Sequence, residues 1–304
     1  MTDNYLNSWN ETEIKKSITD FVTKVTAENS PGFIPVNERI AVFDNDGTLW
    51  TEQPLQVEIF YALYRMKILS GKDPSLKNTQ PFKAFIEEDI KTLSTFGKKE
   101  LLEIAFKSHD GKTPQEFYRN VKEFFENSVH PKFKFSYYNC AYKPQLELLD
   151  YLRANGFKIF IVSGGGLEFM RVVTEKIYEI PNERVIGSTT ATEVVYDGTK
   201  PVINRLPQLS NFDDKEEKVL NIHHHIGGVP VLAFGNSDGD LSMLRYTLNS
   251  SEYNLALLLH HDDASREVAY DKDFVLSPLN EALKVSAAEG IRVVSMKNDW
   301  NEVF

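Results

Sequence analysis

Three short apolar runs, each ending abruptly in a polar or glycine-rich turn, constrain the fold of this chain most. They span residues 39–43, 157–162 and 230–234, and they end at Asp44, Ser163 and Gly235. Continuously apolar runs of this length are typical of buried strands in a parallel sheet. Helical patterns separate the runs, as at residues 144–155 and 167–178. This order predicts an α/β fold whose core is a doubly wound, Rossmann-like parallel sheet.

The pattern is different between residues 54 and 140. Apolar residues recur at helical spacing over residues 55–66, and Thr113-Pro114 begins a second helix with proline in its first turn. No convincing strand interrupts this stretch. The sequence therefore predicts an all-helical insertion at residues 54–140, carried by an α/β core formed from residues 1–53 and 141–304.

Local patterns predict four further elements. They are a helix at 11–28, a hairpin formed by 192–196 and 201–204, a helix at 219–225 and a strand at 255–259.

Chemically useful side chains follow each of the three apolar runs. Ligands of open α/β sheets bind at the carboxyl ends of the strands, so we expect these side chains to share one crevice. Asp44 and Asp46 are two residues apart and point to the same side of an extended backbone. One of them could act as a nucleophile and the other as an acid and base on the same substrate.

The other two turns suit a phosphate and a metal. Ser163 is followed by three glycines, which allow close approach of the backbone, and by a helix whose N-terminus favours an anion. Residues 235–240 contain Asn236, Asp238 and Asp240, which carry the hard oxygen atoms that Mg²⁺ prefers.

These motifs together resemble those of the haloacid dehalogenase superfamily of phosphatases. The segment from Asp44 to Thr48 resembles the nucleophile motif of that family, Ser163 its second motif, and residues 235–240 its acidic fourth motif. The predicted helical insertion resembles the cap of the phosphoserine-phosphatase-like members. The resemblance covers essentially the whole core.

The resemblance implies a role for each matching residue. Asp44 would be the nucleophile and a metal ligand, and Asp46 would transfer protons and bind the metal through its backbone carbonyl. Ser163 would bind the phosphoryl group, and we assign Gly47, Thr48 and Gly164 to the same phosphate site. Mg²⁺ is the implied cofactor. The dehalogenases themselves lack an acid at the position of Asp46, so this residue indicates phosphate chemistry.

Two positions leave alternatives open. The third motif of the family is a lysine, and both Lys215 and Lys218 lie in range; we favour Lys218 because the apolar segment of the predicted helix follows it directly. The fourth motif commonly begins Gly-Asp, whereas Asn236 follows Gly235 here. Asp44 and Asp240 are then the more secure side-chain ligands, with Asn236 or Asp238 as a third contact.

The sequence thus predicts a magnesium-dependent phosphohydrolase that cleaves small phosphomonoesters through an aspartyl-phosphate. The alternatives are a phosphotransferase of the same fold and a non-catalytic protein that binds a phosphorylated ligand. A net charge of −10 without a strong basic run argues against a nucleic-acid partner. The apolar runs are too short for a membrane span, and the N-terminus predicts no secretory signal, so we expect a cytoplasmic protein. The sequence predicts neither the substrate nor the oligomeric state.

Three other features have simpler interpretations. Three adjacent histidines, 223–225, splay around a helix and cannot share one metal. Residues 260–263 are predicted to be a solvated loop. Trp50 and Glu52 are predicted to line the entrance to the site.

Overall fold

The computed structural model describes residues 5–93, 95–250 and 252–304. Its centre is a seven-stranded sheet in the order β4-β3-β2-β1-β5-β6-β7. The strands are β1 (Ile40–Phe43), β2 (Lys158–Gly166), β3 (Val185–Asp197), β4 (Lys200–Asn211), β5 (Leu232–Gly235), β6 (Leu255–His260) and β7 (Arg292–Ser295). Neighbouring strands are parallel except for the antiparallel pair β3 and β4. The predicted doubly wound α/β core is confirmed, with one antiparallel strand at its edge.

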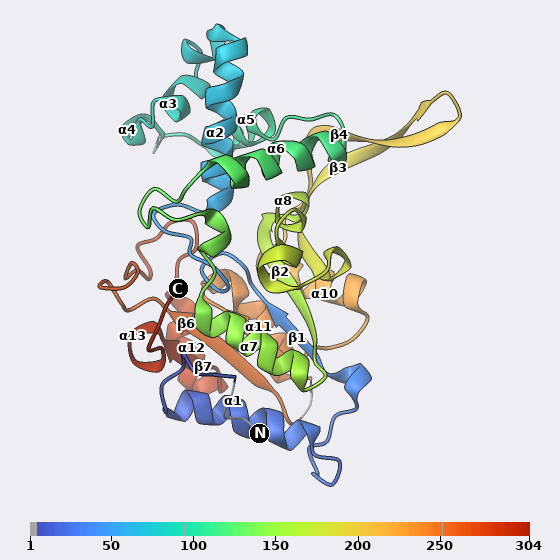
Figure 1. Ribbon diagram of the computed structural model, residues 1–304, viewed down its shortest axis with the longest axis vertical. Coiled ribbons are helices and arrows are strands. Elements are labelled where there is room, and N and C mark those ends of the chain that lie inside the picture. Colours follow the sequence, from blue (N-terminus) through green and yellow to red (C-terminus); the bar gives the residue numbers. More distant parts are fainter. Residues whose placement is uncertain (1–4, 94, 251) are drawn as a thin grey trace.

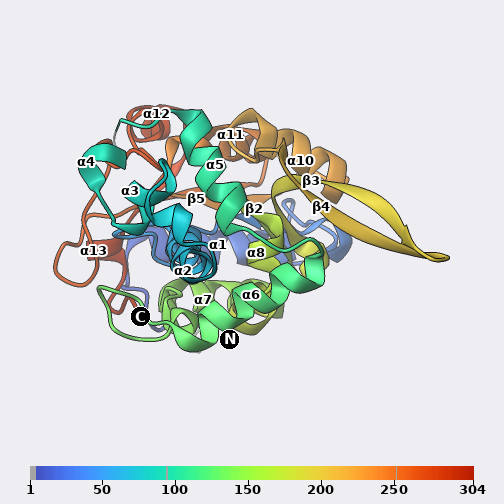
Figure 2. The same ribbon diagram turned by 90° about the horizontal axis from the view of Figure 1, so that it is seen from above.

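Helices cover both faces of this sheet because its central strands are buried on both sides. Along β1, Ala41 and Phe43 belong to one hydrophobic cluster, and Ile40 and Val42 belong to the other. The first cluster includes α1 (Glu13–Thr26) and α7 (Lys143–Ala154); the second includes α10 (Glu216–Ile226), α11 (Leu241–Leu248) and α12 (Glu281–Glu289). Figure 2 shows α10, α11 and α12 along one side of the molecule and α7 on the other.

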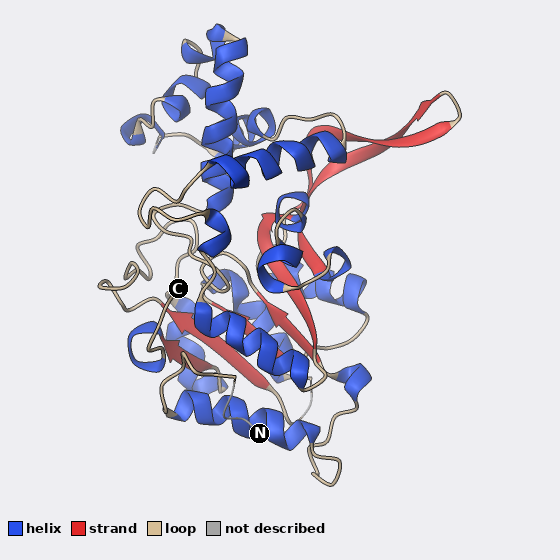
Figure 3. Cartoon of the chain, viewed as in Figure 1, coloured by secondary structure: helices blue, strands red, loops and turns tan. Residues whose placement is uncertain are grey.

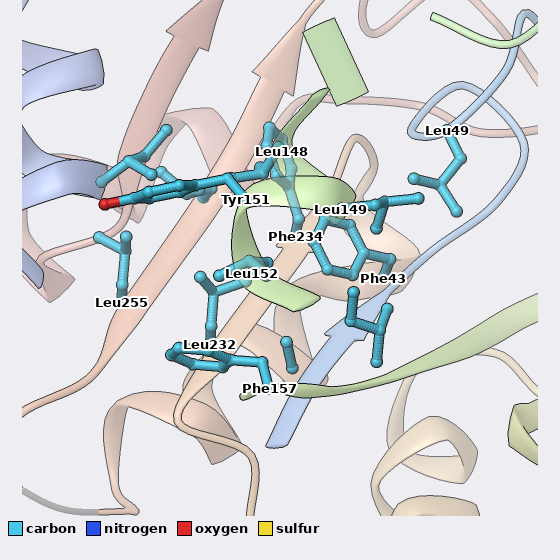
Figure 4. Close-up of a cluster of buried hydrophobic side chains, with 14 of the residues drawn as sticks. Phe43, Leu49, Leu148, Leu149, Tyr151, Leu152, Phe157, Leu232, Phe234 and Leu255 are labelled. Atoms are coloured by element: carbon cyan, nitrogen blue, oxygen red, sulfur yellow. The ribbon is translucent and has the colours of Figure 1, made fainter. Parts of the chain in front are cut away.

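The first cluster joins the centre of the sheet to α7. Phe43 and Phe234, on neighbouring strands, pack with ring centroids 6.0 Å apart. Leu148, Leu149 and Leu152 of α7 lie against them, as Figure 4 shows. This packing fixes the carboxyl ends of β1 and β5, from which the nucleophile motif and residues 235–240 extend.

The helices between residues 54 and 140 lie apart from the sheet, at the top of Figure 1. They are α2 (Val57–Lys72), α3 (Phe82–Ile86), α4 (Ile90–Leu93), α5 (Lys98–Ser108) and α6 (Pro114–Asn127). We call them the cap. An aromatic cluster that includes Tyr61, Phe124 and Phe125 joins the cap to Trp50 and to Phe169 of α8 (Leu167–Arg171). The described part of this stretch contributes no strand to the sheet.

The hairpin formed by β3 and β4 is much longer than predicted, and it projects from the side of the molecule (Figure 3). At its base, Arg205 of β4 contacts the cap. Its backbone N–H donates to the carbonyl of Lys112 at 2.8 Å, and its guanidinium donates to the carbonyl of His109 at 3.0 Å. The same guanidinium pairs with Glu168 of α8 and lies 4.0 Å from the ring centroid of Phe117. The cap is therefore attached to the edge strand β4 as well as being joined to the core through its two chain ends.

Two short helices complete the chain, α9 (Thr174–Tyr178) and α13 (Met296–Asp299). In the described ranges, no helix combines the length and the apolar character that a membrane crossing requires.

Candidate active site

The ends of β1, β2 and β5 meet, as the sequence predicts, and α10 supplies a lysine to the same place. Asp44 follows β1, and its backbone N–H donates to the carbonyl of Phe234 in β5 at 2.9 Å. Ser163 lies within the last residues of β2, since this strand continues through the glycines rather than ending before them. Both residues are buried.

Lys218 lies at the centre of the site. Its Nζ donates to Oδ1 of Asp44 at 2.8 Å, to Oδ1 of Asp240 at 2.6 Å and to the carbonyl of Val162 at 2.9 Å. Burial alone would lower the pKa of this amine, but the carboxylates of Asp240 and Asp44 raise it above its usual range. Lys218 is therefore a fixed positive charge beside Asp44.

Lys215, the alternative lysine, is exposed at the start of α10. Its backbone has a positive φ of 55°, and its N–H donates to the carbonyl of Gly239. Among the described residues, the ion pairs of Asp44 include Lys218 and do not include Lys215. The geometry favours Lys218 as the lysine of the site.

Asp44 and Asp46 differ in their partners. Asp44 interacts with Lys218, whereas Oδ1 of Asp46 accepts a hydrogen bond from Nε1 of Trp50 at 2.8 Å. Burial raises the pKa of both carboxyl groups to about 7. Lys218 opposes this increase at Asp44, and the bond from Trp50 opposes it at Asp46. Asp46 can thus hold or release a proton near neutral pH, as proton transfer requires.

The turn after Asp46 depends on a glycine. Gly47 has φ of +75°, and a Cβ there would overlap the side chains of Asn236 and Glu52. Thr48 donates from its hydroxyl to Oδ1 of Asn236 at 2.9 Å, and Nδ2 of Asn236 donates to Oε1 of Glu52 at 2.9 Å. Thr48 and Gly47 thus position Asn236 in this structure.

The two acids of the fourth motif point to different places. Asp240 is fully buried, and its Oδ2 accepts from the backbone of Asn236 and Ser237 while its Oδ1 faces Lys218. Asp238 instead accepts hydrogen bonds from the backbone of Asn280 and Ala282 at the start of α12. Because Asp238 caps that helix, Asn236 and Asp240 remain as the candidates near Asp44.

The glycine segment of β2 is hydrogen-bonded to an acidic residue of the cap, Glu58. The backbone N–H of Gly166 donates to Oε2 of Glu58 at 2.8 Å, and Oε1 of Glu58 lies 2.8 Å from Nε2 of His109. Ser163 Oγ accepts from the backbone of Gly165 at 3.3 Å. Neither Glu58 nor His109 was identified from the sequence, because no spacing relates α2 to the end of α5 or to the glycines 108 residues later.

One interpretation of the sequence is wrong. His261 is not part of a solvated loop: it is 1% exposed, and its Nε2 lies 2.7 Å from the carbonyl of Gly47. Glu267, also buried, accepts a hydrogen bond from Thr51 and lies near the other ring nitrogen of His261. The loop folds back onto the nucleophile turn, where the carbonyl of Gly47 contacts His261 and the hydroxyl of Thr51 donates to Glu267. The histidines 223–225, by contrast, are exposed, in agreement with their interpretation.

The residues at the three strand ends suit Mg²⁺. They offer carboxylates, an amide oxygen and backbone carbonyls, which are hard oxygen ligands. Asp44, Asp46, Glu52 and Asp240 are all buried, and in the described part of the chain Lys218 is the cation that contacts two of them, Asp44 and Asp240. The described residues contain no group of three or more His, Cys, Asp or Glu side chains already arranged around a metal. A dication would balance the excess negative charge.

Comparisons with known proteins agree with this geometry. The model of the haloacid dehalogenase-like hydrolase family matches residues 41–245. No curated protein matches the chain significantly. A solved structure of a protein of unknown function from Bordetella pertussis Tohama I is 14% identical with a TM-score of 0.54, over 84% of this chain and 98% of that one. A functionally unknown protein from Anaerococcus prevotii DSM 20548 is 18% identical with a TM-score of 0.59, over 96% of this chain and 94% of that one. These two likenesses concern the fold.

Proposed function

The chain belongs to the haloacid dehalogenase-like hydrolases, and on that premise we propose that it is a magnesium-dependent phosphohydrolase that cleaves small phosphomonoesters. The observation that carries the proposal is the buried contact of Lys218 with both Asp44 and Asp240, beside a second acid, Asp46. A phosphate ester and a carboxylate are both anions, so their reaction needs fixed positive charge between them.

In the first half of the reaction, a carboxylate oxygen of Asp44 attacks phosphorus and the bond from phosphorus to the ester oxygen breaks. Asp46, which can hold a proton near neutral pH, gives it to the departing oxygen, and an alcohol leaves. Lys218 stabilises the charge on the transferring group, and Ser163, Gly164, Gly47 and Thr48 are proposed to bind its oxygens.

In the second half, Asp46 accepts a proton from water, and the water oxygen attacks phosphorus. The bond between phosphorus and Asp44 then breaks, which releases inorganic phosphate and regenerates the carboxylate. The same two acids thus serve both steps, in opposite protonation states.

Mg²⁺ is proposed to be held by the Asp44 carboxylate, the Asp46 backbone carbonyl, Asp240 and Asn236. When bound, it supplies Lewis-acid charge that neutralises the phosphoryl oxygens. Asp240 keeps Lys218 in place in the described contacts, so its role includes orientation of the lysine.

Small substrates are favoured by the cap. Asp44 and Asp46 are 6% and 8% exposed, and Glu58 of the cap reaches the glycine segment of β2. A phosphoprotein would have to hold the cap away from the core throughout the reaction, whereas a small ester can be enclosed by it.

Two other functions remain to be separated from hydrolysis. A phosphotransferase would pass the phosphoryl group from Asp44 to an alcohol instead of water. A non-catalytic binding protein would have no use for a second acid positioned as Asp46 is.

Release of inorganic phosphate from a panel of phosphorylated metabolites, with Mg²⁺ and with or without added alcohols, tests these functions. Hydrolysis of at least one ester is the expected result. A dominant phosphorylated alcohol would assign a phosphotransferase. Tight binding of phosphorylated compounds without turnover would contradict the catalytic proposal.

A further inference from the structure

Glu52 is a fully buried carboxylate that the proposed reaction does not use. Its hydrogen bonds in the described part of the chain come from neutral groups. They are Nδ2 of Asn236 (2.9 Å), the hydroxyl of Tyr270 (2.7 Å), the hydroxyl of Ser277 (2.6 Å) and Nε2 of Gln56 (3.4 Å). A carboxylate buried without a cation is costly for the folded state. A role in the site would explain why it is there.

The contact between Glu52 and Asn236 fixes the orientation of the amide. Only the nitrogen of an asparagine side chain can donate to a carboxylate, and only its oxygen can accept from the hydroxyl of Thr48. With Nδ2 facing Glu52, Oδ1 faces Thr48 on the nucleophile turn. This carbonyl oxygen has a second lone pair free for a cation, since one hydroxyl occupies only the first.

The same contact suits an amide at position 236 better than an acid. Burial raises the pKa of the Glu52 carboxyl to about 8, so an acid at position 236 would either face a second anion at about hydrogen-bond distance or have to share a proton with Glu52. Gly47 has no side chain to separate them, because both Asn236 and Glu52 occupy the space that its Cβ would take. Glu52 therefore favours an amide over an acid at position 236.

We propose that Glu52 is a positioning residue of the metal site: through its contact with Nδ2 it orients Oδ1 of Asn236 for a cation bound near Asp44. Partners just outside a metal site orient its ligands and raise their basicity in this way. The proposal rests on the proposed function, because it requires that a divalent cation bind near Asp44.

The C-terminal part of the chain holds Glu52 in place. Tyr270 stacks on His261 with ring centroids 4.4 Å apart, and His261 contacts the carbonyl of Gly47. Tyr270 and Ser277 then donate to the two oxygens of Glu52. This segment thus holds the carboxyl group, whose Oε1 accepts from both Tyr270 and Asn236.

The test is a set of four proteins: wild type, Glu52→Gln, Asn236→Asp and the double variant. The affinity of each for Mg²⁺ is measured by titration calorimetry without substrate, and thermal unfolding checks the fold. We expect Glu52→Gln to weaken Mg²⁺ binding about 10- to 100-fold. Asn236→Asp alone is also expected to weaken it, although it adds an acid to the site. In the double variant, the amide introduced at position 52 can donate to the carboxylate introduced at position 236. Its affinity should therefore recover to within about threefold of wild type.

Glu147→Gln is the matched control, because Glu147 also accepts hydrogen bonds but lies on α7 beside Ser8. It should leave the Mg²⁺ affinity unchanged. If Glu52→Gln does not fold, the effect of Asn236→Asp on Mg²⁺ affinity still decides, because tighter Mg²⁺ binding by this variant overturns the proposal. If all four proteins fold, a double variant whose loss of Mg²⁺ affinity equals the sum of the two single losses also overturns it. Absence of Mg²⁺ binding by wild type would instead overturn the proposed function, and this proposal with it.

Discussion

Lys218 and Asp44 are 174 residues apart in the chain, yet Nζ of Lys218 lies 2.8 Å from Oδ1 of Asp44. The start of α10 and the end of β1 meet at one point of the sheet, and Asp240 closes the arrangement from the other side of Nζ. An ammonium held by three acceptors has little freedom to turn away when a substrate binds. The site is therefore largely organised before the phosphate arrives, which is the condition for strong electrostatic stabilisation.

Replacement of Lys218 by methionine keeps the bulk of the side chain and removes its charge. We expect a loss of about 2–4 kcal/mol of transition-state stabilisation, or about 30- to 900-fold in kcat/KM. Lys215→Met is the matched control, since Lys215 is exposed, and it should change little. Steady-state kinetics of both variants, with thermal unfolding in Mg²⁺ to confirm folding, make the comparison. A large loss at Lys215 with Lys218→Met near normal would reverse the assignment.

Asp44→Asn should abolish turnover, because an amide cannot form the aspartyl-phosphate. The fold should persist, because Asp44 is hydrogen-bonded to β5 through its backbone N–H, which the substitution does not change. Phosphate release and the circular dichroism spectrum together check this expectation. Retention of wild-type activity by the variant would remove Asp44 from the mechanism.

Asp46 should make the stability of the metal-free protein depend on pH. Burial raises the pKa of its carboxyl from 3.8 to about 7, so between these values the folded chain holds a proton that the unfolded chain has lost. Stability contributed by this group therefore falls as pH rises from about 4 to 7, and the full penalty is present above 7. Its size is on the order of a few kcal/mol.

Asp46→Asn removes this titration while keeping an acceptor for Trp50. In EDTA, we expect the variant to gain stability relative to wild type between about pH 5 and pH 8, as thermal or urea unfolding would measure. Asp150→Asn, at an exposed position of α7, is the control and should show no such trend. Parallel pH profiles for wild type and Asp46→Asn would contradict the prediction. The same variant should lose most of its activity at all pH values.

Removal of divalent cations should reduce phosphate release to background, and Mg²⁺ should restore it best. Ca²⁺ is expected to support little activity or to inhibit, because it takes more ligands in a looser geometry than the octahedral site of Mg²⁺. Activity assays after exhaustive EDTA treatment, followed by addition of each ion, provide the measurement. Full activity in EDTA would refute the requirement for a metal.

Much of the fold was predictable because buried parallel strands leave a clear pattern. The runs that end at Asp44, Ser163 and Gly235 became β1, β2 and β5, and their ends meet as the rule for α/β sheets requires. The hairpin was recognised only around its turn at residues 198–199, because the exposed strands beyond it alternate weakly. Near the C-terminus, α12 and β7 fell outside the recognised pattern, since both are short and only partly buried.

The contacts around the site were less predictable than its central residues. His261 was predicted to lie in a solvated loop and Glu52 at the entrance to the site, yet tertiary hydrogen bonds bury both. The contacts of Glu52 with Tyr270 and of His261 with Gly47 each join residues more than 200 positions apart, so no local pattern could identify these contacts. In the sequence, Glu58 is one of the polar residues of the cap helix α2, and only the folded structure shows that it contacts Gly166.

The contacts of Arg205 add to the attachments of the cap, which also include its two chain ends, the aromatic cluster with Phe169 and the hydrogen bond from Gly166 to Glu58. A lid joined to its base at two points can rotate about the line between them. A third point off that line prevents this rotation unless it detaches or the piece that carries it bends. Exposure of Asp44 to a substrate by rotation of the cap therefore requires release of the bond between Gly166 and Glu58 and of the aromatic packing. It also requires either release of the hydrogen bonds between Arg205 and residues 109–112 or bending of the long hairpin. The free energy needed for that step lowers the rates of substrate entry and product release. It does not change the activation barrier of the proposed phosphoryl transfer.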